Sequence, residues 1–212
     1  GRLDMKQIYS QLTQIRPVCV LDATHPYADE VTKNIKEACQ TAGFPYMRIL
    51  RENTDMTENV TGSAKAHIRV ADSMREAVDL LNDKPYLEKN ILLTTGSKHL
   101  PDYTKIQDYQ NRAYLRLLPS PEMLQKAVDT GFLPAHLIAM QGPFSQELNV
   151  ALIKQSGIGV LVTKQSGKSG GFEEKISAAE QTGTDVIVIK RPKQEDGKNL
   201  SEAEAELKKI MT

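Results

Sequence analysis

The sequence lacks tryptophan, has only two cysteines, and carries no excess of either charge. Its 212 residues include 27 Lys and Arg against 27 Asp and Glu, so the formal net charge is zero. Nucleic acids and anionic membranes attract a basic excess, so this balance disfavours both as general partners. No apolar run reaches the roughly 18 residues typical of a membrane span, and no apolar signal segment opens the chain. We therefore expect a cytoplasmic globular protein without a membrane partner.

The two cysteines and four histidines do not form a recognisable metal or disulfide pattern. Cys19 lies in an apolar run and Cys39 on a helical pattern, so both are predicted to be reduced thiols that serve packing. No CxxC, HExxH or paired-histidine spacing is present, so no metal site is predicted. The chain also begins at Gly1 without an initiator methionine, which favours a shortened or processed form.

Short β-branched runs alternate with longer amphipathic patterns along the whole chain, which predicts an α/β fold with mainly parallel sheets. Many of the expected strands are apolar throughout, as is typical of strands covered on both faces. The expected strands are 18–21, 46–50, 67–70, 91–94, 113–118, 137–140, 159–162 and 186–189. The expected helices are about 4–14, 27–42, 73–82, 120–130, 145–156, 170–182 and 201–211.

The polar stretch 52–66 interrupts this alternation and reads as a linker or an irregular excursion. Two smaller sheets are therefore favoured over one sheet of eight strands. We place the boundary near residue 70, which gives an N-terminal lobe of residues 1–70 and a C-terminal Rossmann-like lobe of residues 71–212. The predicted fold is thus two Rossmann-like lobes with a cleft between them.

Four of the expected strands end in clusters of polar, Gly or Pro residues. Ligands of open parallel sheets bind outside the carboxyl ends of the strands, so these clusters indicate a ligand site. Each cluster also has a plain structural explanation, because Thr24 and Ser145 suit helix caps and single lysines are usually solvated. The clusters are 22–27, 95–98, 141–145 and 163–171.

Neither of the common phosphate motifs is complete. Gly167-Lys168-Ser169 imitates the end of a P-loop, but Val162 stands where that motif needs its first glycine. No GxGxxG is present. What remains is a Ser/Gly-rich turn before a helix, whose backbone N–H groups suit an anion.

The clusters, in this order, resemble the precorrin-6A reductase family, which includes the cobalt-precorrin-6A reductases of cobalamin biosynthesis. The resemblance spans residues 22–192, nearly the whole chain. Gln165 and Lys168 depart from it, since the family often has Asp and Gly there. Family members also usually begin with a further strand and a Gly-Gly-Thr turn, so we expect part of the cofactor-binding surface to be missing. The matching segments are 22–26, 93–98, 116–119, 140–145 with Asn149, 163–167, 170–172 with Lys175, and 191–192.

The resemblance implies an NAD(P)H-dependent oxidoreductase that acts on a CH–CH bond, reducing one double bond of precorrin-6A or cobalt-precorrin-6A to give precorrin-6B. NADPH or NADH is the implied cofactor, and a small-molecule tetrapyrrole is the implied substrate. His25 is the candidate proton donor, because its ordinary pKa suits proton transfer near neutrality, with Asp22 as its orienter. The candidate cofactor-binding residues are Thr24, Thr95, Gly96, Ser97, Gln141, Gly142, Ser166, Gly170 and Gly171. The candidate substrate-binding residues are Lys98, Arg116, Phe144, Lys164 and Lys175.

Two other functions remain open at this point. A methyltransferase or synthase of the same pathway would not respond to nicotinamide cofactors. A non-catalytic module that binds and hands on a tetrapyrrole would bind substrate without reducing it.

Overall fold

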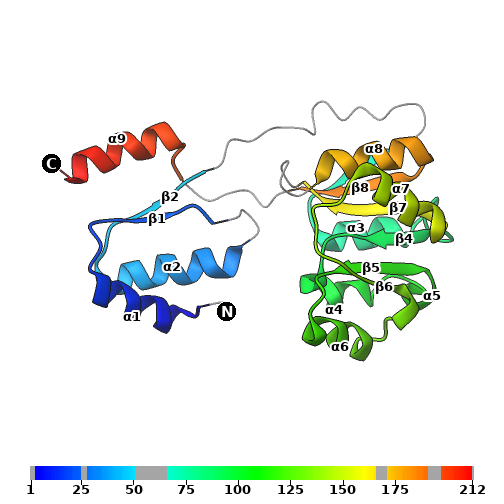
Figure 1. The fold of residues 1–212 in the computed structure, drawn as a ribbon, viewed down its shortest axis with the longest axis horizontal. Coiled ribbons are helices and arrows are strands. Elements are labelled where there is room, and N and C mark those ends of the chain that lie inside the picture. Colours follow the sequence, from blue (N-terminus) through cyan, green and yellow to red (C-terminus); the bar gives the residue numbers. More distant parts are fainter. Residues whose placement is uncertain (1–2, 25–27, 51–65, 166–170, 191–196, 212) are drawn as a thin grey trace. The chain divides into compact units, whose positions relative to one another are not determined.

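The computed structural model describes residues 3–24, 28–50, 66–165, 171–190 and 197–211. Within these residues the chain divides into two compact units, one made of residues 1–54 and 192–212 and the other of residues 55–191. Each unit contains a parallel β-sheet and helices (Figure 1). The predicted mixed α/β fold with mainly parallel sheets is confirmed. None of the helices in the described ranges is long and apolar enough to cross a membrane.

The first unit is built on a two-stranded parallel sheet of β1 (Val20–Asp22) and β2 (Tyr46–Arg48). Helices α1 (Met5–Ile15) and α2 (Asp29–Ala42) pack together over a small core that includes Ile8, Leu12 and Cys39. Helix α9 (Leu200–Met211) lies on the other side of this sheet (Figure 1). Lys198, just before α9, bonds through its backbone to Arg48 and Leu50, which ties the C-terminal segment to the end of β2.

The two-unit division differs from the boundary expected at residue 70. Residues 68–71 form β3 of the second sheet, so that unit begins earlier than the sequence suggested. The C-terminal helix, expected in the second lobe, returns to the first unit because of the backbone pairing beside Lys198. Residues 51–65, which include nearly all of the expected linker, lie outside the described residues.

The second unit contains a six-stranded, entirely parallel sheet in the order β3-β8-β7-β4-β5-β6. Strands that are apolar throughout need helices on both faces of their sheet. The two hydrophobic clusters of this unit identify these helices. Helices α3, α4 and α6 cover one face, and α7 and α8 cover the other. Its strands are β3 (Ile68–Ala71), β4 (Asn90–Leu93), β5 (Ala113–Leu117), β6 (Leu137–Ala139), β7 (Ile158–Lys164) and β8 (Asp185–Ile189). Its α-helices are α3 (Met74–Leu81), α4 (Leu100–Tyr103), α5 (Tyr109–Arg112), α6 (Pro121–Asp129), α7 (Gln146–Gln155) and α8 (Phe172–Thr182).

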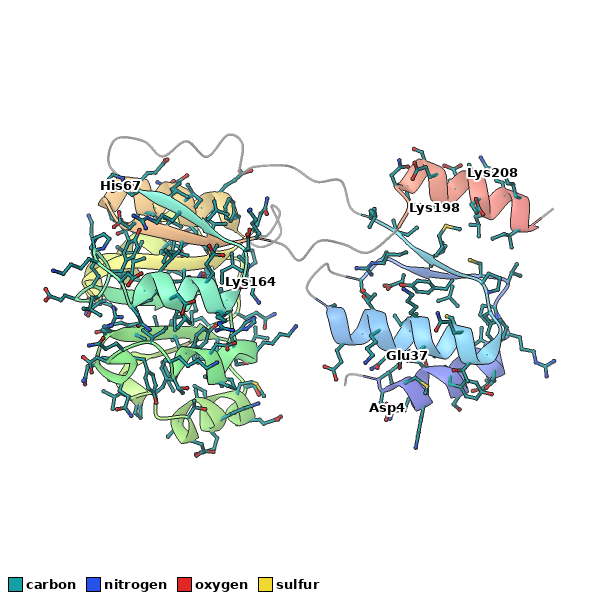
Figure 2. The ribbon with its side chains drawn as sticks, turned by 180° about the vertical axis from the view of Figure 1, so that it is seen from behind. Asp4, Glu37, His67, Lys164, Lys198 and Lys208 are labelled. Atoms are coloured by element: carbon teal, nitrogen blue, oxygen red, sulfur yellow. The ribbon has the colours of Figure 1, made fainter. Side chains whose placement is uncertain are left out.

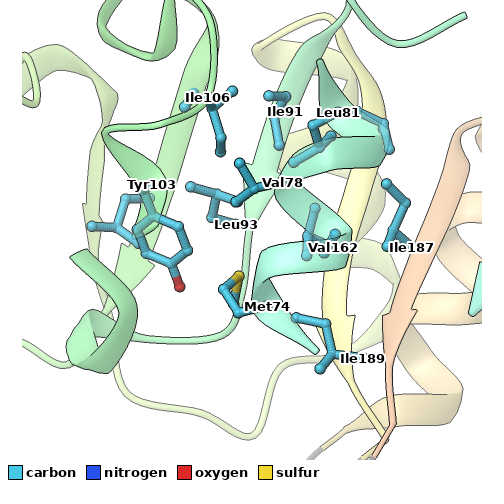
Figure 3. Packing of buried hydrophobic residues seen from close by; sticks show 14 of the residues in the cluster. Met74, Val78, Leu81, Ile91, Leu93, Tyr103, Ile106, Val162, Ile187 and Ile189 are labelled. Carbon is cyan, nitrogen blue, oxygen red and sulfur yellow. The ribbon is translucent and has the colours of Figure 1, made fainter. Parts of the chain in front are cut away.

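The larger core lies between the sheet and the α3–α4–α6 layer (Figure 3). Val78 and Leu81 of α3 meet Ile91 and Leu93 of β4, and all four are at most 3% exposed. Burial of this kind contributes roughly 1.5–3 kcal/mol for each large aliphatic side chain. The unit therefore holds the carboxyl ends of its strands on a rigid platform.

Strand order reverses between β4 and β7. From β4 the chain proceeds outward through β5 and β6, crosses by α7 to the opposite face, and returns to β7 on the other side of β4. At such a reversal the loops after the two central strands leave in opposite directions, which opens a crevice where ligands of α/β proteins bind. The 3-10 turn η1 (Ser97–His99) follows β4 at this edge.

Candidate functional site

A pocket of about 350 Å³ opens at the carboxyl edge of the six-stranded sheet. It is formed by the segments that follow β4, β5 and β6, together with one side chain from the first turn of α8. Its volume is at the lower end of the range typical of small-molecule pockets, so it suits one part of a ligand. The lining residues are Thr94, Thr95, Gly96, Arg116, Leu117, Leu118, Met140, Gly142, Pro143, Phe144 and Lys175.

Two buried cations dominate the chemistry of this pocket. Arg116 is 5% exposed and Lys175 is 6% exposed, although both line the cavity. Burial lowers the pKa of Arg116 to about 10. Burial, reinforced by the charge of Arg116 and opposed by Glu174, lowers the pKa of Lys175 to about 8. The described residues that line the pocket include these two cationic groups and no Asp or Glu.

The strand pattern explains why Arg116 faces this site. Side chains alternate along β5, and Ala113, Leu115 and Leu117 face the α3–α4–α6 layer. Tyr114 packs toward α7 and α8, so Arg116, two residues later, faces the same way. Its Nη1 donates a hydrogen bond of 2.8 Å to Oδ1 of Asn149, a residue of α7 that is 1% exposed.

The segment after β6 covers one face of the Arg116 guanidinium. The Phe144 ring centroid lies 4.1 Å from the central carbon of Arg116, which is a cation–π contact. Gly142 permits this approach, because a Cβ there would lie 3.0 Å from the Phe144 ring. Ser145 then begins α7, and its hydroxyl accepts a hydrogen bond from the Leu148 backbone. The plain structural role expected for Ser145 as a helix cap is thus observed.

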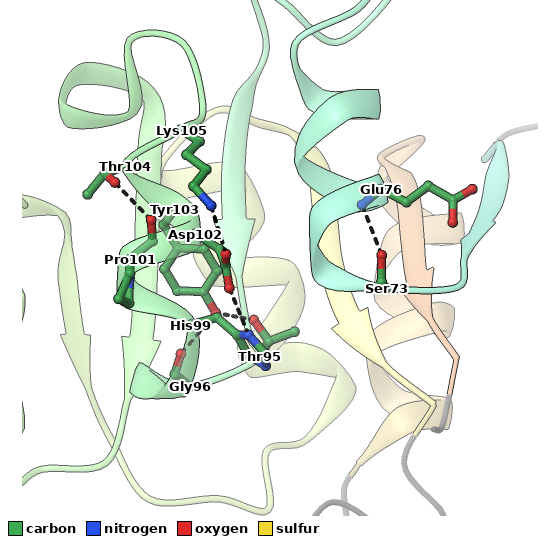
Figure 4. A network of polar contacts seen from close by, with 10 residues as sticks. All are labelled: Ser73, Glu76, Thr95, Gly96, His99, Pro101, Asp102, Tyr103, Thr104 and Lys105. Atoms are coloured by element: carbon green, nitrogen blue, oxygen red, sulfur yellow. Dashed lines mark hydrogen bonds and ion pairs between the residues drawn. The ribbon is translucent and has the colours of Figure 1, made fainter. Parts of the chain in front are cut away.

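The turn after β4 is held by a network of hydroxyl groups (Figure 4). Tyr103, which is fully buried, donates a 2.9 Å hydrogen bond to the Gly96 carbonyl and contacts the Thr95 hydroxyl. Gly96 has φ = +78°, a conformation that favours glycine. Tyr103 therefore fixes the backbone of the pocket rim from beneath, and burial raises the pKa of its hydroxyl.

His99 lies beside this rim and was not among the predicted site residues. Its Nδ1 is 3.2 Å from a carboxylate oxygen of Asp102 (Figure 4). Burial lowers the pKa of His99, and the charge of Lys164 adds to this effect while the bond to Asp102 opposes it. This pair could not be predicted from the sequence, because α4 is too short to show a helical period.

The predicted site residues separate into four groups, one of which, Asp22 and Thr24, lies in the first unit. Those that line the pocket are Thr95, Gly96, Gly142, Arg116, Phe144 and Lys175. Those in the second unit that do not line it are Ser97, Lys98, Gln141, Lys164 and Gly171. Those that lie outside the described residues are His25, Ser166 and Gly170.

The predicted residues that do not line the pocket lie at or after the ends of β4, β6 and β7, which belong to the same edge of the sheet. Ser97 donates to the Met123 sulfur, and Lys98 and Gln141 are exposed. Lys164 is the last residue of β7 (Figure 2). Gly171 has φ = +60° and precedes α8 without a side-chain cap. The first turn of a helix presents backbone N–H groups, which suit an oxyanion.

Asp22 and Thr24 belong to the first unit, at the end of β1. Asp22 is 1% exposed and pairs with Arg48, whose Nη1 lies 2.6 Å from its Oδ1. Tyr46 donates a hydrogen bond to the same carboxylate, and so does the Thr24 backbone. Burial opposes ionisation of Asp22, but these hydrogen bonds and the charge of Arg48 together lower its pKa. Arg48 also holds the Thr24 carbonyl, so this network fixes the chain immediately before residue 25.

Within the described ranges, no group of three or more His, Cys, Asp or Glu side chains converges as a metal site would require. Cys19 and Cys39 are both free, and Cys39 is 1% exposed in the first unit's core.

The family model described as "Precorrin-6x reductase CbiJ/CobK" matches residues 1–209. The chain is 35% identical over 202 residues to a cobalt-precorrin-6A reductase of Priestia megaterium, covering 93% of this chain and 74% of that protein. It is 33% identical over 192 residues to a cobalt-precorrin-6A reductase of Methanothermobacter thermautotrophicus, covering 91% of this chain and 60% of that protein. The solved structure of a CobK precorrin-6A reductase matches with a TM-score of 0.69 and 24% identity, covering 99% of this chain and 80% of the other, a likeness of fold.

Proposed function

The chain belongs to the precorrin-6x reductase family CbiJ/CobK, and we propose that it reduces one C=C bond of the cobalt-precorrin-6A macrocycle in cobalamin biosynthesis. The names of the relatives support this reaction. Because the chain spans 74% of one relative and 60% of another, the activity of the whole protein is part of the proposal. A reductase needs a hydride donor, and NADPH or NADH is our proposed donor.

The observation that carries this function is the positively charged pocket at the carboxyl edge of the second sheet. Corrin precursors carry several carboxylate side chains on a large apolar ring. Arg116 and Lys175 supply cations for such carboxylates, and Leu118, Met140 and Phe144 supply apolar surface for a ring edge. Lys98 and Lys164 are further proposed substrate contacts near the same edge.

The turn residues around the pocket are our proposed cofactor contacts. Thr95 and Gly96 follow β4, and Gly171 precedes α8, so backbone and hydroxyl donors are available for the oxygen atoms of a dinucleotide. This donor set fits a nicotinamide dinucleotide, which supplies the hydride when bound. Thr24, Ser97, Gln141, Gly142, Ser166 and Gly170 remain proposed contacts of the same kind.

Reduction of a C=C bond adds a hydride to one carbon and a proton to the other. We propose His25 as the proton donor and Asp22 as the group that positions it. Support comes from the Asp22 carboxylate, which accepts a 3.0 Å hydrogen bond from the Thr24 backbone directly before His25. We also propose the cytoplasm as the compartment, which the free Cys19 and Cys39 support.

Cofactor oxidation by the purified full-length protein tests the reaction. With cobalt-precorrin-6A or precorrin-6A, we expect the 340 nm absorbance of NADPH or NADH to fall in step with loss of the substrate spectrum. Substrate binding without cofactor oxidation would contradict the reaction and favour a carrier role. Failure to bind either macrocycle would favour another enzyme of the pathway.

The residue assignment has its own test. Arg116→Ala and Lys164→Ala should each raise the substrate KM or lower kcat, whereas Lys154→Ala on the exposed face of α7 should do neither. If Arg116→Ala and Lys164→Ala both match the Lys154 control, the pocket is not the substrate site.

A further inference from the structure

The guanidinium of Arg116 is held in one orientation by two neighbours of different chemistry. Phe144 covers one face of it, and Asn149 accepts a hydrogen bond from Nη1. Asn149 is itself fixed, because its Nδ2 donates a 2.8 Å hydrogen bond to the Ser145 carbonyl. Both ends of the amide are thus used, so the Asn149 oxygen is directed at Arg116. The remaining N–H groups of Arg116 stay available to the pocket it lines.

Asn149 is a neutral acceptor, which is unusual beside a buried arginine. Buried cations are generally paired with carboxylates, because an unpaired charge in the interior is costly. Among the described residues, Arg116 makes no salt bridge, and the lining of its pocket adds a second cation, Lys175. The arrangement orients the guanidinium without neutralising it. A guanidinium held at a cavity in this way favours a ligand that brings negative charge.

We propose that this pocket is a subsite for a single oxyanion group, bound by Arg116, and that Asn149 and Phe144 are positioning residues that aim the guanidinium at it. The ligand oxyanion is a carboxylate or a phosphate, both of which a guanidinium edge binds with two parallel hydrogen bonds. This inference rests on the proposed function for its two sources, which are a side-chain carboxylate of the macrocycle and a phosphate of the dinucleotide.

Asn149→Asp tests the role of the neutral acceptor. The substitution changes little in shape but places a carboxylate beside Arg116, so the ligand must compete with an internal ion pair. We expect at least a tenfold loss of affinity for the oxyanion ligand, with kcat at saturating ligand changed less than threefold. Gln155→Glu is the matched control, because it makes the same charge change at an exposed position of the same helix and should leave affinity unchanged.

Titration of wild type and variants with the macrocycle, NADP⁺ and NAD⁺ identifies the source. Weaker binding of the macrocycle alone assigns the subsite to a substrate carboxylate. Weaker binding of NADP⁺ alone assigns it to the 2′-phosphate, and weaker binding of both nucleotides assigns it to the diphosphate. Folded Asn149→Asp protein that binds all three ligands as tightly as Gln155→Glu overturns the proposal.

A second variant covers the case in which Asn149→Asp does not fold. Phe144→Leu keeps an apolar side chain in the half-buried loop but uncovers the guanidinium face, and we expect a threefold to tenfold loss of affinity for the same ligand. Unchanged affinity in folded Phe144→Leu contradicts its positioning role and, without a folded Asn149 variant, the proposal. These titrations measure binding, so they remain decisive even if the wild-type protein oxidises no cofactor and the proposed reaction fails.

Discussion

Replacement of Lys175 by methionine is expected to stabilise the protein. The pKa of Lys175 lies near 8 in the folded chain, against an ordinary value of 10.5. Each pKa unit corresponds to about 1.4 kcal/mol, so holding the protonated amine in this pocket costs the folded state about 3 kcal/mol at pH 7. Methionine has a similar length and no charge, so Lys175→Met should recover most of this cost and raise Tm by roughly 6–12 °C.

The direction of the Lys175 pKa shift also determines how the stability gain of Lys175→Met depends on pH. Because the folded-state pKa of Lys175 is depressed, the unfolded chain binds more protons between pH 8 and pH 10.5, and wild-type stability gains over that window. The methionine variant has no such gain. Its advantage should therefore be full at pH 7, shrink as pH rises above 8, and disappear near pH 10.5.

Urea unfolding followed by circular dichroism, at several pH values from 7 to 10, measures both effects. Lys154→Met is the control for loss of an exposed lysine and should change the free energy of unfolding by less than about 0.5 kcal/mol. A Lys175→Met protein that is less stable than wild type at pH 7, or whose advantage does not vary with pH, would refute this account of the pocket's electrostatics.

Three further variants probe the scaffold. Arg112→Met removes a guanidinium that donates hydrogen bonds to four backbone carbonyls, and it should lower the free energy of unfolding, measured in urea, by about 3–5 kcal/mol. A decrease of less than about 1 kcal/mol would contradict this prediction. Arg48→Met leaves the Asp22 carboxylate buried without its cation and should lower the free energy of unfolding by about 3–5 kcal/mol at pH 7. Because the pKa of Asp22 is depressed in the wild type, the stabilisation from this network should be lost as pH falls below about 4. Acid unfolding that is the same in the variant as in the wild type would contradict this. Tyr103→Phe should cost about 1–2 kcal/mol and speed hydrogen exchange at the turn after β4, since it removes the bond to the Gly96 carbonyl; unaltered exchange there would count against that bond.

The secondary structure of this chain could be read from the sequence because it is locally encoded. All eight expected strands are present with ends shifted by up to two residues, and the seven expected longer helices are present too. The short helices α4 and α5 were missed, since four residues do not display a helical period. The return of the C-terminal segment to the first unit was not predicted, because it depends on the pairing of Lys198 with the end of β2, a contact between distant segments.

The candidate site was predictable in composition but not in arrangement. Arg116 and Lys175 were predicted because they lie in segments that resemble the reductase family and could supply cations for its carboxylate-bearing substrate. The acceptor role of Asn149 was not evident, since it depends on how α7 crosses β5 and no sequence period reports that crossing. The expected edge of four clusters also divided, because β1 belongs to a separate sheet from β4, β6 and β7.

The order of strands has a consequence for synthesis of the protein on the ribosome. Strand β3 precedes β4–β7 in the chain, yet in the described sheet it pairs with β8, which follows all of them. Folding of the first unit is also completed only after β8 has been made, because the segment at Lys198 that pairs beside β2 follows β8 in the chain. Both units are thus completed by segments that follow β7 in the chain, while β4–β7 and their helices are free to fold first. Premature termination between β7 and β8 would leave both β7 and the end of β2 without their later partners, and unpaired sheet edges of this kind promote aggregation.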